Sequence, residues 1–457
     1  MGSRFAGSIT MYQNPASTIA SKDTIDFSIA SLQVNNFTNF IQFGYAPLLR
    51  KNPITTFEFT EGDYARDLIT SLNLSLLSAK YKLNPKTAVG FGINFRSMIN
   101  VHTSHYNLTD SSTDIIAFLE QNTGSLPFKG NAATSNWMEY VGNFSHNLVD
   151  NRKMILNAGV NLRLNRGLLG LIGSIDSLEF QKANLFGNDF YTIKNADFLY
   201  GYSTTGTAWD NTQRFRENWR NVMRETKWGA SIDMGAEWLI KSNKESDWFY
   251  EGLDYNYIWK IGLSLLDLGY ANYQYYPESV KTNGIKEDMT PEVLLDKFIG
   301  VIDNIASFND TVSTVVQSFT KLNGNFKIFH PARWLLNIDR RITGNFFMNV
   351  AANIPISFVN RNANYVLNDA GIFSFTSRYE RERVGLYLPV MYNTKTKLHV
   401  GAAVRMGPVI VGFNNLNIFN NKVSLQNSSG YMSLLIRIKP KVRKPNYDFI
   451  KSPQRVS

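Results

Sequence analysis

The chain contains no cysteine, which excludes disulfide bonds, thiolate catalysis and cysteine-based zinc sites. It also lacks an uninterrupted apolar run of about 18 residues, the length that a membrane-spanning helix needs. Charged residues make up only 18% of the sequence, and the net charge of +10 is spread along the chain rather than gathered in one patch. The lack of a long apolar run excludes a helical membrane protein. Because the positive charge is dispersed, we expect no nucleic-acid partner.

Catalytic motifs are absent as well. The sequence shows no serine nucleophile elbow, no phosphate-binding glycine loop and no zincin helix. The histidines have no spacing that identifies a ligand set, and we interpret them as structural or solvated: His102, His105, His146, His330 and His399. We therefore expect no enzyme activity, no metal and no cofactor.

The pattern that is present is alternation with period two, which is typical of strands whose two faces meet different surroundings. Between Val89 and Val101, apolar residues alternate with small or polar ones. The same alternation recurs at Met154–Asn165, Lys227–Lys241, Asn345–Phe358, His399–Gly407 and Tyr431–Lys439. These stretches are long for a soluble sheet but suit strands that cross a bilayer, which need about 9–11 residues. We predict an all-β fold, a transmembrane antiparallel β-barrel of about 14 strands.

The apolar faces of these strands are predicted to meet lipid, and the polar faces to line the barrel interior. An aromatic content of 13% fits the girdles of residues that mark the two membrane surfaces. The predicted inward charges form a polar network of the lumen: Arg96, Arg163, Asp233, Glu237, Arg405 and Arg437. We interpret this network as cross-strand ion pairs that line or close the pore, in preference to a binding site.

Long segments without alternation predict loop insertions. They lie at about 103–135, 203–225 and 271–328 within a barrel region of 22–440, and a basic tail follows at 441–457. Helical spacing within two of these insertions predicts loop helices. The sequence does not show on which side of the membrane they lie.

Helical spacing is clearest in the second insertion, where Phe215 and Trp219 recur among basic residues that include Arg214 and Arg220. One interpretation is a basic amphipathic helix that lies on lipid headgroups or on a partner protein. The other, which we favour from sequence alone, is a loop helix that packs its aromatic stripe on the barrel rim.

Two prolines, Pro355 and Pro389, fall inside alternating stretches. Proline removes a hydrogen-bond donor from the sheet and marks a bulge, an edge or a kink, so either residue is a candidate for a lateral opening in the wall. The interpretation that we favour for both is a strand end near the membrane rim.

Several short segments resemble a known group of barrels. They are Ala6-Gly7-Ser8, Asn14-Pro15-Ala16, Lys260–Gly269, Tyr387–Val390 and Gly401–Gly412. Together they resemble an uncharacterised Bacteroidota outer-membrane family related to FadL and to PorV, the type IX secretion shuttle protein. The resemblance implies that residues 1–21 fold inward as a hatch with Asn14, Pro15 and Ala16 as its motif. In FadL relatives, hydrophobic ligands pass this hatch and leave through the wall.

These observations predict a non-enzymatic barrel of the bacterial outer membrane, with its signal peptide removed before the first residue given. Our main prediction is a subunit of, or accessory to, an envelope complex for secretion or outer-membrane assembly. The alternative is a FadL-like transporter of small hydrophobic ligands through a lateral wall opening, and the second alternative is a soluble β-rich binding protein. The expected partners are outer-membrane lipid, other outer-membrane or periplasmic proteins and, for the transporter, a hydrophobic ligand.

Overall fold

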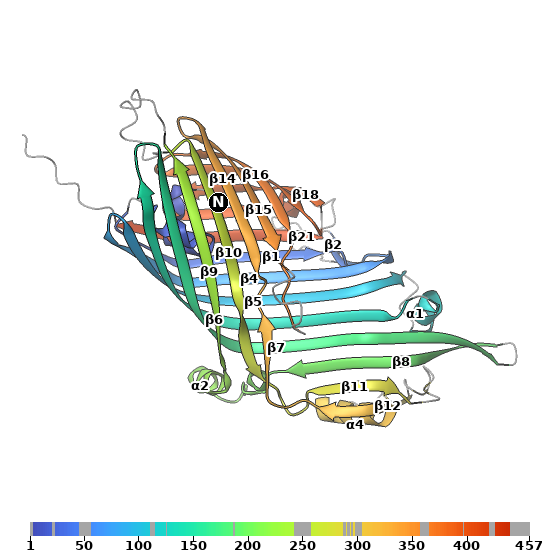
Figure 1. Ribbon diagram of the computed structural model, residues 1–457. Helices are drawn as coiled ribbons and strands as arrows, with labels where there is room; N and C mark the ends of the chain where they lie inside the picture. The colour runs from blue at the N-terminus through green and yellow to red at the C-terminus, as the bar shows by residue number, and fades with distance from the viewer. Residues whose placement is uncertain are drawn as a thin grey trace, which may run out of the picture.

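The computed structural model describes residues 3–20, 23–44, 56–109, 115–124, 126–185, 188–241, 257–286, 289, 293, 296–297, 304–356, 365–395, 397–419 and 426–438. Most of them lie in one antiparallel sheet that closes into a 14-stranded β-barrel (Figure 1). Closure is made by β1 (Ile25–Thr38), which pairs with β4 (Gly62–Asn84) on one side and with β21 (Asn427–Ile438) on the other. The predicted fold class and strand number are confirmed.

The other barrel strands follow one another around the wall in chain order, because each is joined to its neighbour as an antiparallel pair. They are β5 (Thr87–Leu108), β6 (Phe128–Asp150), β7 (Met154–Leu185), β9 (Trp228–Ile240), β10 (Trp259–Gln274), β14 (Arg333–Thr343), β15 (Phe346–Pro355), β16 (Ile372–Glu380), β17 (Val384–Asn393), β18 (Lys397–Val400) with β19 (Ala402–Met406), and β20 (Val409–Phe413). The pair β18 and β19 forms one barrel strand in two pieces, since both halves pair with β17.

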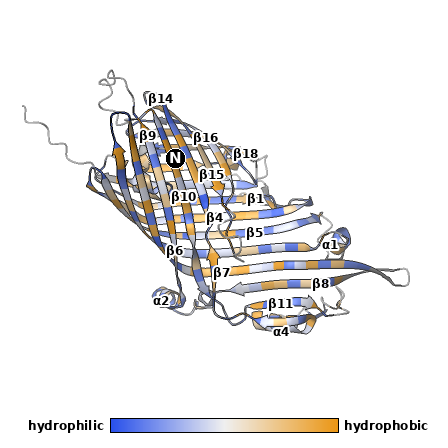
Figure 2. Ribbon diagram, in the orientation of Figure 1, coloured by the Kyte–Doolittle hydropathy of each residue, from blue (hydrophilic) through white to orange (hydrophobic). Residues whose placement is uncertain are grey.

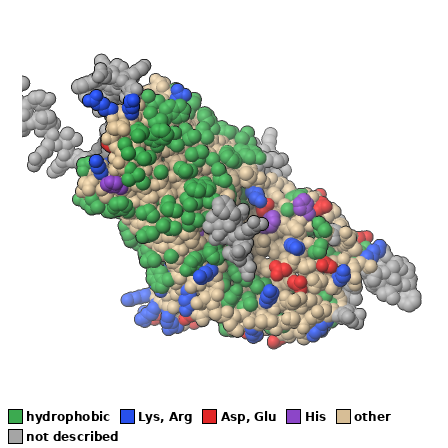
Figure 3. Space-filling view, viewed as in Figure 1, with side chains coloured by type: hydrophobic (Ala, Val, Ile, Leu, Met, Phe, Trp, Pro, Cys, Tyr) green, Lys and Arg blue, Asp and Glu red, His purple; other side chains and the backbone are tan. Residues whose placement is uncertain are grey.

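The barrel wall is apolar outside and polar inside. On β7, the outward Leu162 is 63% exposed, whereas its inward neighbours Asn161 and Arg163 are buried. Hydropathy alternates along the strands in this way around the wall, and a broad band of hydrophobic side chains covers the outer surface (Figures 2 and 3). Exposed leucine beside buried arginine inverts the pattern of a soluble protein. The soluble alternative is therefore wrong, and the band fits lipid.

Several strands continue well beyond the barrel and build a second sheet region, here called the extension. It contains the distal halves of β5, β6 and β7, together with β8 (Asn188–Tyr202), β11 (Val280–Ile285), β12 (Val316–Lys321) and helix α4 (Ile305–Val315) (Figure 1). The alternation at Met154–Asn165 predicted a shorter strand, but β7 continues to Leu185 as a single strand of 32 residues. Alternation outside the membrane looks the same as alternation inside it, which is why the sequence did not separate the two.

The connections at the two ends of the barrel differ in length. One end has tight turns at 85–86, 344–345 and 407–408, and the opposite end has the long connections that form the extension. Residues 242–256, which follow β9 in the sequence, lie outside the described part of the chain. In outer-membrane barrels short turns face the periplasm and long loops face the exterior. We therefore assign the extension to the extracellular side.

The insertions have different boundaries from those predicted, because pairing continues past the membrane. The first narrows to 109–127 and holds α1 (Ile115–Asn122). The second holds η4 (Thr204–Thr207) and α2 (Phe215–Glu225). The third holds β11, α4, β12 and β13 (Asn325–Phe329). Smaller elements are η1 (Arg4–Tyr12), η2 (Pro15–Thr18), η6 (Leu416–Phe419) and the hairpin of β2 (Ile41–Gly44) with β3 (Thr56–Phe59).

The predicted tail 441–457 lies outside the described residues. Among the helices that the structure describes, none has the length and apolar character needed to cross a membrane.

Candidate functional site

Residues Arg4–Thr18, here called the plug, lie inside the barrel near its short-turn end. Met11 and Ala16 are completely buried, and Phe5 almost so. The turn η2 contacts β6, β7 and β9, and η1 contacts β1 and β4, so the plug touches the wall on several sides. In Figure 1 the N-terminus falls within the outline of the barrel. The plug occupies the place that the resemblance assigned to a hatch.

Asn14 fixes the plug at both of its amide atoms. Its Nδ2 donates to the carbonyl of Ala236 on β9 at 2.9 Å, and its Oδ1 accepts from the N–H of Ala16 at 3.0 Å, which caps η2. The carbonyl of Pro15 accepts from Asn143 Nδ2 at 3.2 Å. The three residues singled out in the sequence thus lie together against the inner wall.

Glycines in the wall make room for the plug. A Cβ atom on Gly159 would overlap the backbone of Pro15 and Ala16, and one on Gly235 would overlap the Asn14 side chain. A bare backbone at these inward positions allows the plug to approach the sheet closely. The small inward residues of the alternating strands, such as Gly159 and Gly235, therefore contact the plug and do not line an open channel.

Beyond the plug, an ion-pair cluster crosses the lumen. Arg163 on β7 donates to Glu139 on β6 at 3.2 Å, to Asp267 on β10 at 3.0 Å and to Asp233 on β9. Arg96 on β5 adds contacts to Glu139 at 3.0 Å and to Asp267 at 2.6 Å. All five side chains are buried, so each charge depends on its partners. The network predicted from the sequence did not include Glu139 or Asp267.

Three side chains in this cluster have the donor types of a metal site. Glu139, Asp267 and His330 each offer a ligand atom within 4.8 Å of the others. However, Arg96 and Arg163 already donate to the carboxylate oxygens, and their positive charges oppose a cation. The arrangement fits an ion-pair cluster better than a metal centre.

The remaining predicted lumen charges lie apart from this cluster. Glu237 accepts from Lys260 Nζ at 2.6 Å and from Ser17 of the plug at 3.0 Å. Arg405 stacks on the ring of Phe5 at 3.9 Å and donates to backbone carbonyls between β16 and β17. Arg437 lies on β21 in register with Asp26, and its side chain is outside the described part of the structure. The single predicted network is in fact several separate clusters.

The two prolines occupy different positions. Pro355 is the last residue of β15. Pro389 lies within β17 at the point where its partner strand breaks between β18 and β19, and its carbonyl accepts from the N–H of Gly401 at 2.8 Å. The strand-end interpretation is therefore wrong for Pro389, which marks an irregularity in the wall. The inward Pro389 side chain is buried there.

The extracellular mouth of the lumen is closed by an apolar core. Tyr273 and Phe326 pack with Trp137 and with Leu367, and all of these side chains are buried. Strand β13 pairs with the end of β10 to bring Phe326 into this core. Plug, ion-pair cluster and apolar core together fill successive levels of the barrel interior.

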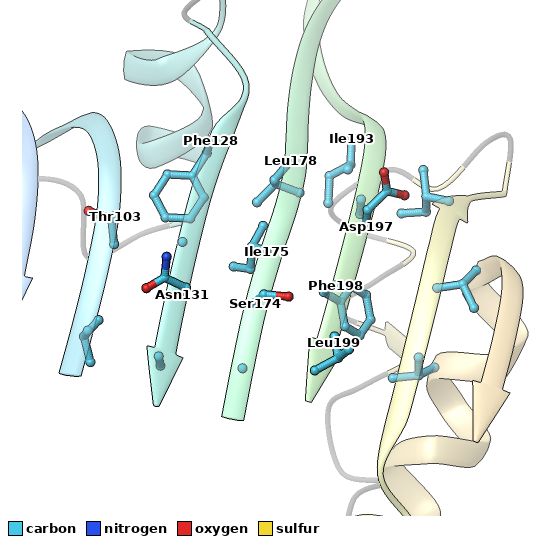
Figure 4. Close-up of a pocket in the computed structure, with 18 of the residues that line it drawn as sticks. Thr103, Phe128, Asn131, Ser174, Ile175, Leu178, Ile193, Asp197, Phe198 and Leu199 are labelled. Carbon is cyan, nitrogen blue, oxygen red and sulfur yellow. The ribbon is translucent and has the colours of Figure 1, made fainter. Parts of the chain in front are cut away.

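An apolar pocket of about 520 Å³ lies instead in the extension (Figure 4). Strand register shows which face of the sheet it occupies: Val101 pairs with Ala132, Ala132 with Gly173, and Ile175 with Phe198. Leu171, two residues before Gly173, is exposed on the same face, whereas Ile172 is buried on the lumen side. The pocket floor thus belongs to the outward face, which continues into the lipid-facing wall.

Small residues hollow this floor and a helix covers it. Gly130, Ala132 and Gly173 leave space between the larger Phe128 and Phe198. Helix α4 contributes further lining residues with the strands beside it: Phe308, Val312, Val315, Val316 and Ile285. The lining is almost entirely apolar, so the pocket suits a ligand without charge.

Helix α4 is anchored over the pocket by polar contacts at its rim. Asn309 Nδ2 donates to Glu278 Oε2 at 2.6 Å, and Lys321 Nζ donates to Glu278 Oε1 at 3.0 Å. The Tyr200 hydroxyl donates to Asn309 Oδ1. Hydrogen bonds from Asn309 and Lys321 lower the pKa of the Glu278 carboxyl.

Helix α2 does not pack its aromatic stripe on the barrel. Phe215 is 72% exposed and Trp219 38% exposed, and Arg214 and Arg220 are exposed as well. The buried side of the helix is instead held by Asn218, which donates to the carbonyl of Asp210 at 2.7 Å. The rim-packing interpretation that the sequence favoured is wrong.

The closed wall, the outer apolar band and the inward N-terminal segment define a transmembrane β-barrel of the outer-membrane type. Residues 15–414 match the model of DUF5723, a family of unknown function, and the chain belongs to that family. No curated protein matches the sequence.

Among solved structures, the chain is similar to a FadL homologue of Pseudomonas aeruginosa, with 9% identity over 95% of each chain and a TM-score of 0.43. It is also similar to the toluene transporter TodX of P. putida, with 10% identity, 95% of each chain and a TM-score of 0.40. For the toluene transporter TbuX of Ralstonia pickettii, the identity is 10%, the coverage is 94% of each chain and the TM-score is 0.38. At these values the similarity is one of barrel topology and carries no argument about activity.

Proposed function

We propose that this protein binds a small apolar molecule in the extracellular pocket, as the first step of its uptake across the outer membrane. The observation that carries the proposal is the pocket itself. Its volume of about 520 Å³ lies within the roughly 300–1,000 Å³ of ligand sites, and the surface that it offers is almost entirely apolar, with Asp197 as the one carboxylate in its lining. A hydrocarbon ring or a short acyl chain fits this chemistry.

The position of the pocket supports capture at the membrane surface rather than entry through the lumen. The floor faces outward, and the lumen beside it is filled by the apolar core that contains Tyr273 and Phe326. A ligand therefore reaches the pocket from solvent or from the adjoining lipid. Passage to the periplasm would then need displacement of the core, the cluster and the plug, or a path through the wall near Pro389.

The prediction of an envelope-complex subunit, with PorV-like and type IX secretion relatives, stays a prediction. Crosslinking in native membranes is its test, and capture of a stable outer-membrane complex would support it.

Pocket binding is tested with a variant whose larger side chain occupies the pocket. Tritiated toluene and decane are titrated against the protein in lipid nanodiscs, with empty nanodiscs subtracted. Ala132 is exposed in the pocket floor, so Ala132→Trp occupies the space and should weaken saturable binding at least about tenfold. Ala230→Trp is the matched control, because Ala230 is exposed on the outer face of β9 away from the pocket. Equal binding by both variants, or no saturable binding of either probe, would contradict the proposal.

A further inference from the structure

A basic and aromatic surface lies on the extracellular side of the barrel, apart from the pocket. It consists of helix α2 and the preceding Trp209, and is here called the α2 surface. We propose that the α2 surface binds the phosphate-bearing headgroups of anionic membrane lipids at the outer edge of the barrel. The proposal does not depend on the apolar-ligand function.

The aromatic part of this surface is organised but uncovered. Trp209 and Phe215 contact each other edge to face with ring centroids 6.0 Å apart, and Phe215 stacks with Trp219 at 6.5 Å. All three side chains are more than a third exposed. Exposed aromatic rings of this size are costly in water and are typical of the interface between lipid tails and headgroups.

A row of arginines lies beside the aromatic rings. On a helix, Arg216, Arg220 and Arg224 recur every four residues and so share one face, and Arg214 precedes the first turn. Within the part of the chain that the structure describes, Arg214, Arg216 and Arg220 have no carboxylate at ion-pair distance. Arg224 lies 3.6 Å from Glu225, and Glu217 is the other acidic residue of the helix.

Between Trp209 and Glu225, four guanidinium groups and three carboxylates, those of Asp210, Glu217 and Glu225, leave the α2 surface positively charged. Such a helix, with aromatic and basic faces side by side, is the arrangement of interfacial helices that bind anionic lipid. Guanidinium groups pair well with phosphate oxygens.

The position of α2 relative to the wall decides between lipid and other anions. Arg166 follows the outward, lipid-facing Leu162 and Leu164 on β7, and its guanidinium donates to the carbonyl of Met223 in the last turn of α2 at 2.7 Å. The same guanidinium stacks on Trp228, the first residue of β9, at 4.8 Å. The helix is therefore fixed to the outside of the barrel where the apolar band ends.

Figure 3 shows the same relationship, with basic side chains gathered near α2 directly beside the hydrophobic band. Continuity with the lipid-facing wall makes membrane lipid the occupant that this surface fits.

The experiment measures lipid binding to the whole protein. Native mass spectrometry in detergent follows the titration of palmitoyl-oleoyl phosphatidylglycerol and of the zwitterionic phosphatidylcholine with the same chains. The triple variant Arg214→Gln, Arg216→Gln, Arg220→Gln should bind phosphatidylglycerol roughly 100-fold more weakly, roughly fivefold for each arginine, with little change for phosphatidylcholine. Its remaining binding should depend less on salt than that of the wild type.

A matched control removes three charges elsewhere on the extracellular side, by Lys129→Gln, Lys281→Gln and Lys286→Gln. This variant should retain the preference for phosphatidylglycerol. A second variant, Phe215→Ser with Trp219→Ser, should weaken binding of both lipids, and circular dichroism with an unchanged unfolding midpoint shows that each variant is folded. An unchanged phosphatidylglycerol affinity in the arginine variant, or an equal loss in the lysine control, would overturn the proposal. So would a protein adduct as the main product of photo-crosslinking from position 220 in native membranes.

Discussion

The backbone N–H of Asp267 donates to Oδ1 of Asp233 at 2.8 Å, across the pair of strands β9 and β10. Asp267 has a φ of 61°, which is unusual for a residue other than glycine, and it sits at a bulge between Leu265 and Leu268. The bulge turns the Asp267 carboxylate into the lumen, where it meets Arg96, Arg163 and Arg333. An irregularity of one strand thereby completes the ion-pair cluster.

Removing one charge from this cluster should destabilise the barrel strongly. Arg163→Met leaves Asp233, Glu139 and Asp267 short of their shared partner, and breaking a buried ion pair costs about 3–5 kcal/mol. Urea unfolding in detergent micelles measures the loss. Arg340→Met is the control, because Arg340 is exposed on the outer wall and stacks on Trp259, so its loss should cost less than about 1 kcal/mol. Similar losses for the two variants would contradict the role given to the cluster.

The plug should limit conduction through the barrel. Gly159→Val adds side-chain atoms where Pro15 and Ala16 contact the wall, so it should displace the plug and raise ion conductance in planar bilayers above that of the wild type. Gly142→Val is the control, since Gly142 faces outward and its nearest heavy atom would lie 4.0 Å from the new Cβ. Deletion of residues 3–20 should have the same effect as Gly159→Val. Wild-type conductance in both plug variants, with the barrel folded, would mean that the plug does not seal the short-turn end.

The sequence predicted the strands of the barrel wall better than the contacts inside the barrel. Period two placed Arg96, Arg163 and Asp233 on the inward face, and the structure brings these three into one cluster. Glu139 was within reach of the same reasoning, because it lies on the same inward face of β6 as the polar Asn143, four residues further along. Asp267 was not, because a bulge changes the face of a residue without changing the local pattern.

The pocket was also beyond sequence reasoning. Its cover, α4, lies more than 100 residues from most of its floor on β5, β6 and β7, and local periodicity carries no information about such distant packing. The helix at 215–225 was predicted correctly, but not which of its faces is covered. Helical spacing shows that a stripe exists, and only tertiary structure shows whether anything lies against it.

Ligand binding should respond to the anchor of α4. The pKa of Glu278 is lowered by hydrogen bonds from Asn309 and Lys321, so the charged carboxylate stabilises the cover above its unfolded pKa of about 4.3. That contribution is lost as the pH falls through the lower, folded pKa. Wild-type affinity for toluene in nanodiscs should therefore decrease at acid pH, by about two- to fivefold for an exposed group. Glu278→Gln should show the reduced affinity at neutral pH and a flat profile, and a profile like that of the wild type would rule out this anchor.

The most direct test of the central claim is the location of a bound apolar ligand. Crystals soaked with bromobenzene, and measured at the bromine absorption edge, report where the halogen lies. The account predicts an anomalous peak on the outward face of the extension, between Gly173 and Val312. It predicts that the peak is absent from crystals of Ala132→Trp. A peak inside the barrel, against the plug or the ion-pair cluster, with none in the extension, would contradict it.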